Sequence, residues 1–145
     1  MCDIHTAVRS AAWAPFQVEL LPQPDMNIVC FALGHPSLAT LEEANDLVDR
    51  VYRALNVGDG RPVRALDYVV TKTTLRAEEY GDAPLAIVEA LGFSADDYRR
   101  AGGIAVIRCT VMDPFLATRR GRTDYLAGFV ATLQRELAAA LPIGD

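Results

Sequence analysis

Residues 104–112, Ile-Ala-Val-Ile-Arg-Cys-Thr-Val-Met, form an apolar run that contains one charge, Arg108. Asp113-Pro114 ends the run. Short apolar runs that stop at such turn signals are typical of buried strands, in which successive side chains point to opposite faces of a sheet. We therefore predict a strand here, with Arg108 on the same face as Val106 and Thr110.

Three other segments have the composition of strands. Residues 27–33, Asn-Ile-Val-Cys-Phe-Ala-Leu, are mostly apolar and too short for a typical helix, which predicts a buried central strand. Residues 66–74 are rich in β-branched side chains, and the segment 16–20 precedes a breaker that contains Pro22 and Pro24. The sequence therefore predicts about four strands.

Amphipathic helices separate these strands. Thr40 and Glu43 have the spacing of a capping box, and the apolar residues of 41–55 recur at helical spacing. A second apolar stripe predicts a final helix at 123–141, with Thr123 as its N-cap. Shorter helices are predicted at 84–91 and 94–100.

The alternation of strands and helices predicts the fold class α/β (α+β). We expect a small mixed or antiparallel sheet of about four strands, with helices packed on one face. The strands at 27–33 and 104–112 are apolar on both faces, so the uncovered face is expected to dock against another domain. The 145 residues leave room for one domain, which we place at 16–145 after a poorly ordered segment, 1–15.

Bulk composition argues against several classes of function. The net charge of -5 and the pI of about 5.0 do not suit nucleic-acid binding, which depends on clustered lysine and arginine. No uncharged stretch reaches the roughly 20 residues that span a bilayer. Cys2, Cys30 and Cys109 are odd in number and lack CxxC spacing, which fits a reduced, cytoplasmic protein.

Arg108 is the most informative single residue, because both of its neighbours in the run are apolar. In one interpretation it extends toward solvent from a strand end, or pairs with a carboxylate on a neighbouring strand. In the other, its planar guanidinium binds the carboxylate or phosphate of a ligand bidentately. The pattern alone favours the first, structural interpretation.

The other polar residues carry weaker signals. His35 is most simply a loop histidine, and two histidines with three scattered cysteines predict no metal site. Asp46 and Asp49 are expected on the solvated face of the helix at 41–55. The arginines of 119–122 could bind an anion near the start of the last helix, although a solvated loop is the commoner explanation. Polar loops are predicted for the other acidic residues, Glu78, Glu79, Asp82, Asp96 and Asp97.

Four blocks of sequence occur in an order and spacing that resembles a known family. The blocks are PDMNIVCF at 24–31, YVVTKTTL at 68–75 followed by Tyr80, IRCTVMDP at 107–114, and Thr123-Asp124-Tyr125. They resemble the carboxy-terminal region of the group II pyridoxal-phosphate-dependent decarboxylases, the family of the glutamate, tyrosine and aromatic amino-acid decarboxylases. The resemblance covers nearly everything from Phe16 to Leu141.

The resemblance implies a small domain like that of the fold-type I pyridoxal-phosphate enzymes, with a specific role for Arg108. The matching arginine lies at the boundary between small and large domains, where it would bind the substrate's α-carboxylate and align the scissile bond while the cofactor serves as electron sink. Asp113 departs from the asparagine that the family usually has before Pro114, and its charge could occupy the guanidinium.

The resemblance also implies that pyridoxal phosphate is held outside this chain. The family's catalytic lysine forms a Schiff base with the cofactor and typically stands in a His-Lys pair, whereas Lys72 is the only lysine here and follows Thr71. We therefore expect no catalytic or cofactor-binding residue in the chain. Pyridoxal phosphate would bind only in an assembly with a large domain, and the isolated chain would be inactive.

Three hypotheses follow. In the first, the chain is a subunit or fragment that completes a large, cofactor-binding decarboxylase chain, or a homo-oligomer through the apolar sheet face, and supplies Arg108 to a shared site. In the second, it is a non-catalytic interaction or ligand-binding module derived from that domain. In the third, the likeness concerns the fold alone and carries no function.

Overall fold

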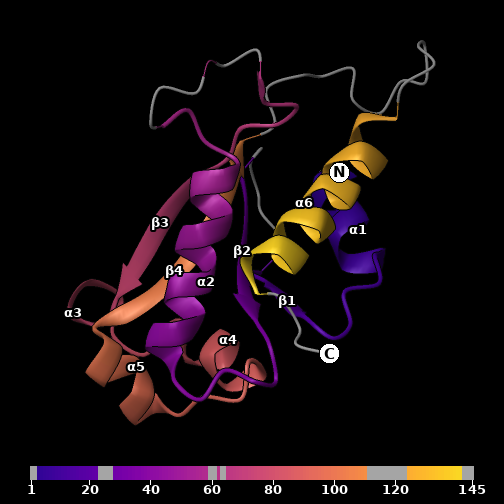
Figure 1. The fold of residues 1–145 in the computed structure, drawn as a ribbon. Helices are drawn as coiled ribbons and strands as arrows, with labels where there is room; N and C mark the ends of the chain where they lie inside the picture. Colours follow the sequence, from indigo (N-terminus) through magenta and orange to yellow (C-terminus); the bar gives the residue numbers. More distant parts are fainter. Residues whose placement is uncertain (1–2, 23–27, 59–61, 63–64, 111–123, 142–145) are drawn as a thin grey trace.

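The computed structural model describes residues 3–22, 28–58, 62, 65–110 and 124–141 (Figure 1). Its strands form one antiparallel sheet in the order β1-β2-β4-β3, so β4 lies inside the sheet between β2 and β3. The predicted fold class is confirmed. The strands are β1 (Gln17–Leu20), β2 (Ile28–Gly34), β3 (Thr71–Arg76) and β4 (Gly103–Thr110).

The helices include the predicted ones and two that the sequence pattern did not reveal, α1 and α3. One further difference concerns the start of the last helix. The last helix begins after Asp124, whose carboxylate accepts hydrogen bonds from the backbone N–H groups of Leu126 (3.1 Å) and Ala127 (3.0 Å); the predicted cap, Thr123, lies outside the described residues. The helices are α1 (Asp3–Ser10), α2 (Leu41–Ala54), α3 (Ala77–Tyr80), α4 (Leu85–Ala90), α5 (Ala95–Ala101) and α6 (Tyr125–Ala140).

Helix α1 corrects the expectation of a poorly ordered start for residues 3–10. Its Val8 is 1% exposed and belongs to the hydrophobic core. Just after the helix, the Trp13 indole N–H donates to the carbonyl oxygen of Val8 (2.7 Å), and the Gln134 side chain of α6 donates to that of Ala12 (2.8 Å). Contacts with distant residues therefore hold a segment that has no convincing period of its own.

Strand β3 is shifted from the predicted 66–74 to 71–76, because the residues before it bind the end of α2. The backbone N–H of Val70 donates to the carbonyl oxygen of Leu55 (3.1 Å), and the Asn56 side chain donates to the carbonyl oxygen of Val70 (3.1 Å). Pairing with β4 begins only at Thr71, opposite Arg108. Residues 111 and 112 of the predicted strand 104–112 lie outside the described residues.

One face of the sheet, here called the first face, forms the larger hydrophobic core with α2 and α6. Every second residue of the two central strands points to this face, as strand alternation requires. The helices bury the apolar stripes that predicted them. The buried core residues of these elements are Val29, Phe31, Leu33, Ala105, Ile107 and Cys109 from the strands, with Leu47, Val48, Val51, Phe129, Leu133 and Leu137 from the helices.

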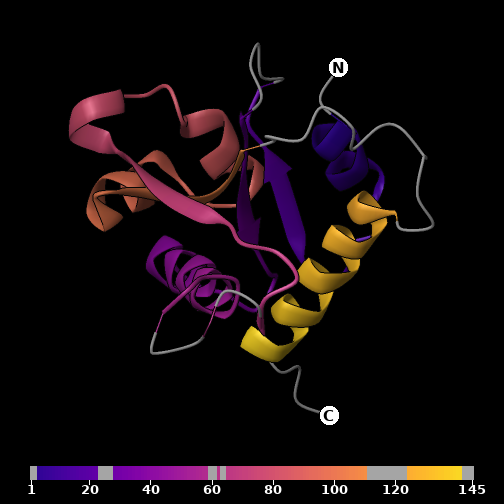
Figure 2. The same ribbon diagram turned by 90° about the horizontal axis from the view of Figure 1, so that it is seen from above.

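The opposite face, the second face, is covered at one end by α4 and α5, which corrects the prediction that helices pack on one face only (Figure 2). Val88 of α4 and Tyr98 of α5 are buried in a cluster with Ala32 and Val106 of the central strands. The Tyr98 hydroxyl donates to the carbonyl oxygen of Leu75 (3.1 Å). The chain's own helices therefore explain part of the apolar character that predicted docking.

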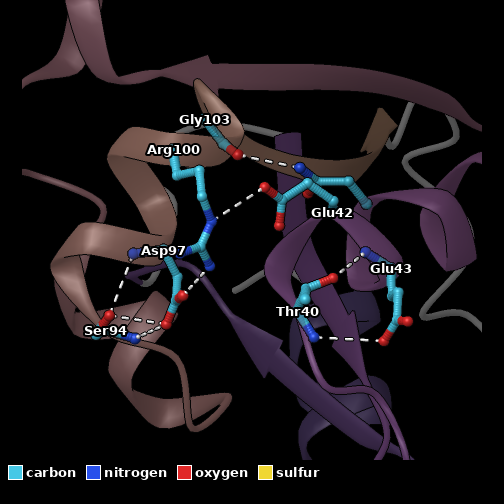
Figure 3. A network of polar contacts seen from close by, with 8 residues as sticks. Thr40, Glu42, Glu43, Ser94, Asp97, Arg100 and Gly103 are labelled. Carbon is cyan, nitrogen blue, oxygen red and sulfur yellow. Dashed lines mark hydrogen bonds and ion pairs between the residues drawn. The ribbon is translucent and has the colours of Figure 1, made fainter.

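Helices α2 and α5 each begin with a capping box, and Arg100 of α5 links the two helices (Figure 3). The predicted box at Thr40 and Glu43 is confirmed, and Ser94 and Asp97 form an equivalent box at the start of α5. Arg100 pairs with Asp97 on its own helix and lies 3.6 Å from a Glu42 carboxylate oxygen on α2.

Among the helices of the described part, none is long and apolar enough to cross a membrane.

The cap of α5 is expected to weaken in acid. Hydrogen bonds from the backbone N–H and hydroxyl of Ser94, with a further one from Arg100, hold the pKa of Asp97 below its ordinary value of 3.8. A folded-state pKa below the unfolded one means that the carboxylate stabilises the fold above about pH 4 and that this is lost as the pH falls through the folded pKa. We expect Asp97→Asn to lower the free energy of unfolding at neutral pH and to have a shrinking effect as the pH approaches the folded pKa.

Urea denaturation of wild type and variant at several pH values checks this. Asp96→Asn is the matched control, because Asp96 is the neighbouring acid on the same helix and its side chain is 91% exposed. An Asp97→Asn effect of constant size from neutral to strongly acidic pH would contradict the role of the charge.

Candidate functional site

Arg108 lies where the covered part of the second face gives way to the exposed part. Its neighbours along β4 on this face are Val106 and Thr110, so the predicted alternation is confirmed. Val106 is buried in the cluster with α4 and α5, whereas Arg108 and Thr110 are exposed. Because α5 lies near the start of β4, Arg108 near the strand's end lies away from it (Figure 1).

Two short side chains flank Arg108 across the sheet. Cys30 of β2 and Thr71 of β3 are its direct partners in the register, and cross-strand partners share one face. The Thr71 hydroxyl donates to the carbonyl oxygen of Arg108 (2.9 Å). Burial raises the pKa of the half-buried Cys30 thiol, and the nearby Arg108 charge partly opposes that rise. We call Arg108, Cys30 and Thr71 the Arg108 site.

The Arg108 guanidinium takes part in none of the ion pairs within the described part of the chain. The basic residues that make them are Lys72, Arg76, Arg99, Arg100 and Arg135. A planar guanidinium on an exposed part of a sheet can bind a carboxylate or phosphate through two parallel hydrogen bonds. The site is therefore chemically suited to grip an anionic ligand.

Lys72 does not complete this site. It follows Thr71 on β3 and is paired with Ile107, so it points to the first face, opposite Arg108. On that face Lys72 forms an ion pair with Asp49, so Asp49 is not simply a solvated acid as predicted. The Lys72 ammonium group also lies 5.3 Å from the centre of the Tyr52 ring. Pyridoxal phosphate needs a lysine for its Schiff base, and the chain's only lysine points to the first face. The residues present at the Arg108 site therefore do not fit this cofactor.

The other predicted candidates lie elsewhere. His35 follows β2, at the other end of that strand from Cys30, and its Nδ1 atom lies 2.7 Å from the Ser37 hydroxyl in a local turn. Among the described residues, no group of three or more histidine, cysteine and acidic side chains could hold a metal ion. Asp113 and the arginines of 119–122 lie outside the described residues.

Cys30 and Thr71 were not identified from the sequence as neighbours of Arg108. Both lie in segments that were predicted as strands, but neither position carries a motif of its own. The missing information was the register of the antiparallel pairs, which one sequence does not contain. The best available signal was that Cys30 and Thr71 both lie in blocks that resemble the decarboxylase family, 24–31 and 68–75.

Comparison with known proteins shows which family the sequence of this chain matches. The model of the family "Tyrosine decarboxylase, C-terminal" matches residues 10–137. The L-tyrosine decarboxylase of Levilactobacillus brevis is 36% identical over 110 residues, which are 76% of this chain and 17% of that protein. The enzyme of the same name from Enterococcus faecalis is 29% identical over 121 residues, or 83% of this chain and 19% of that protein.

The L-tyrosine decarboxylase of Enterococcus faecium is 25% identical over 135 residues, which are 93% of this chain and 21% of that protein. The chain thus spans about a fifth of the length of these relatives. The match extends over all four strands and most of α6. The chain belongs to the family of tyrosine decarboxylase C-terminal domains.

Proposed function

We propose that the chain supplies the small domain of a pyridoxal-phosphate-dependent amino-acid decarboxylase and that Arg108 binds the substrate's α-carboxylate. The observation that carries this proposal is an exposed Arg108 near the end of β4, flanked by two short side chains and outside the ion pairs that the described residues form. The relatives are named L-tyrosine decarboxylases, so tyrosine is the proposed substrate.

Arg108 would bind and orient the substrate. Two parallel hydrogen bonds to a carboxylate fix both its position and its plane, which sets the direction of the bond to be broken. Pyridoxal phosphate would supply the electron sink, and its ligands are proposed to lie on a large domain, because Lys72 is paired with Asp49 on the first face. That large domain is the proposed partner at the exposed end of the second face, in one polypeptide or as a separate chain.

A cytoplasmic location is part of the proposal. Cys30 is a free thiol on an antiparallel strand, and cysteines remain reduced in the cytosol. Homo-oligomers would be compatible with the same site if the second face stays in contact with the large domain.

Reconstitution tests the proposed assembly. We expect no tyrosine decarboxylation by the chain alone and turnover once the cofactor-bearing polypeptide is present. The chain alone, incubated with pyridoxal phosphate and reduced with borohydride, should carry no stoichiometric adduct on Lys72 by mass spectrometry. The control is Lys72→Arg, which keeps a cation near Asp49 but removes the reactive amine.

Two outcomes would contradict this prediction. A stoichiometric adduct at Lys72 that supports turnover would place the catalytic lysine in this chain. Co-purification with a partner that carries no cofactor would instead support the non-catalytic interaction module.

A further inference from the structure

We propose that Cys30 is a positioning residue for Arg108: a short, uncharged side chain directly across the sheet that leaves the guanidinium available to an incoming carboxylate. This inference rests on the proposed function of Arg108. The property of Cys30 that matters is the absence of negative charge within reach of the guanidinium.

The register places position 30 within reach of Arg108. Cys30 and Arg108 are direct partners on β2 and β4, and such pairs have Cβ atoms about 5 Å apart on one face of a sheet. A carboxylate at position 30 would therefore lie on the same face as Arg108 and close to its side chain. Thr71 holds the matching place on β3, but its hydroxyl is already bound to the carbonyl oxygen of Arg108.

The thiol satisfies the requirement for neutrality. Cys30 is half-buried, and burial raises its pKa despite the nearby positive charge, so the thiol stays protonated at neutral pH. An aspartate in the same place would be ionised and would gain more from Arg108 than a solvated pair does, because water is partly excluded there.

The rest of the surrounding face is uncharged as well. The side chains that neighbour Arg108 along β4, across the sheet and on the diagonals of the two adjacent strands carry no formal charge. In the part of the chain that the structure describes, these are Ile28, Cys30, Ala32, Thr71, Thr73, Val106 and Thr110. Among them Cys30 is the only ionisable side chain, and it is one of the two direct cross-strand partners of Arg108.

The kinetic test compares Cys30→Asp with Cys30→Asn in the full decarboxylase, as two variants of similar size that differ in charge. We expect Cys30→Asp to raise KM for tyrosine about tenfold or more, with kcat within about threefold of wild type, because an internal pair competes with substrate binding. Cys30→Asn should stay within about threefold in both parameters. The Asp substitution should add little to Arg108→Ala, since no guanidinium then remains to be occupied.

A second measurement requires no activity and no new charge. The rate of Cys30 alkylation by iodoacetamide, followed against pH by peptide mapping, reports the thiol pKa in the chain. Removing the guanidinium with Arg108→Ala should raise that pKa and slow alkylation at a given pH, and Arg108→Lys should restore the wild-type profile. Arg135→Ala is the control, because Arg135 is an exposed arginine on α6.

The outcomes separate this inference from the proposed function. Unchanged kinetics in Arg108→Ala would overturn the proposed function and, with it, the role of Cys30. A raised KM in Arg108→Ala together with equal behaviour of Cys30→Asp and Cys30→Asn would overturn only the role of Cys30. If Cys30→Asp fails to fold, the alkylation profile decides, and an identical profile in wild type and Arg108→Ala would overturn the pairing.

Discussion

Replacing Arg108 with alanine is expected to lower kcat/KM for tyrosine about 100-fold in the full decarboxylase. Hydrogen bonds to a charged group contribute about 1.5–3 kcal/mol each, and about 2.7 kcal/mol corresponds to that factor. The loss should appear in both parameters: KM should rise because the carboxylate loses its partner, and kcat should fall because the bond to be broken is no longer held in its reactive direction. Steady-state kinetics with tyrosine give both parameters.

Two companion variants make the result specific. Arg108→Lys keeps the charge but loses the planar, bidentate geometry, so its kcat/KM should lie between those of wild type and Arg108→Ala. Arg135→Ala removes an exposed arginine from α6 and should leave the kinetics unchanged. Wild-type turnover by Arg108→Ala would return Arg108 to the structural role that the sequence pattern alone favoured.

The features that could be predicted from the sequence are those encoded by residues close together in the chain. The capping box of α2 depends on Thr40 and Glu43, three positions apart, and both of its hydrogen bonds are present. The face shared by Val106, Arg108 and Thr110 follows from strand alternation within one run. Such signals need no knowledge of what packs against the segment.

The features that could not be predicted depend on distant partners. Tyr98 shows this, because its helix is well marked by the Ser94 cap, but no local pattern says which face of the sheet the helix covers. Residues 66–70 have strand composition, yet Val70 hydrogen-bonds to the end of α2 in place of a strand neighbour. The pairing of Cys30 and Thr71 with Arg108 belongs to the same class, since a register is a relation between strands.

Gly103→Ala is expected to destabilise the chain by about 3–5 kcal/mol, from steric overlap and backbone strain together. Gly103 begins β4 opposite Arg76, with a φ of 153°, a conformation that L side chains rarely adopt. An added Cβ would lie 2.7 Å from the carbonyl oxygen of Leu75 and 2.9 Å from the Cα of Arg76. Both are backbone atoms of β3, so no side-chain rotation can relieve the overlap. Urea denaturation should show a lower midpoint with an unchanged slope.

Gly102→Ala is the matched control, since the neighbouring glycine separates conformational strain from steric overlap. Gly102 ends α5 in the left-handed conformation, with a φ of 75°, but an added Cβ there would meet no atom within 4 Å. Its replacement should therefore cost about 1–2 kcal/mol, from the backbone conformation alone. The difference between the two variants reports the overlap with β3 together with the rarer backbone conformation at Gly103. Equal losses would mean that β3 can move away from β4, and the pairing of Thr71 with Arg108 at the other end of the same ladder would then not be rigid enough to position the guanidinium.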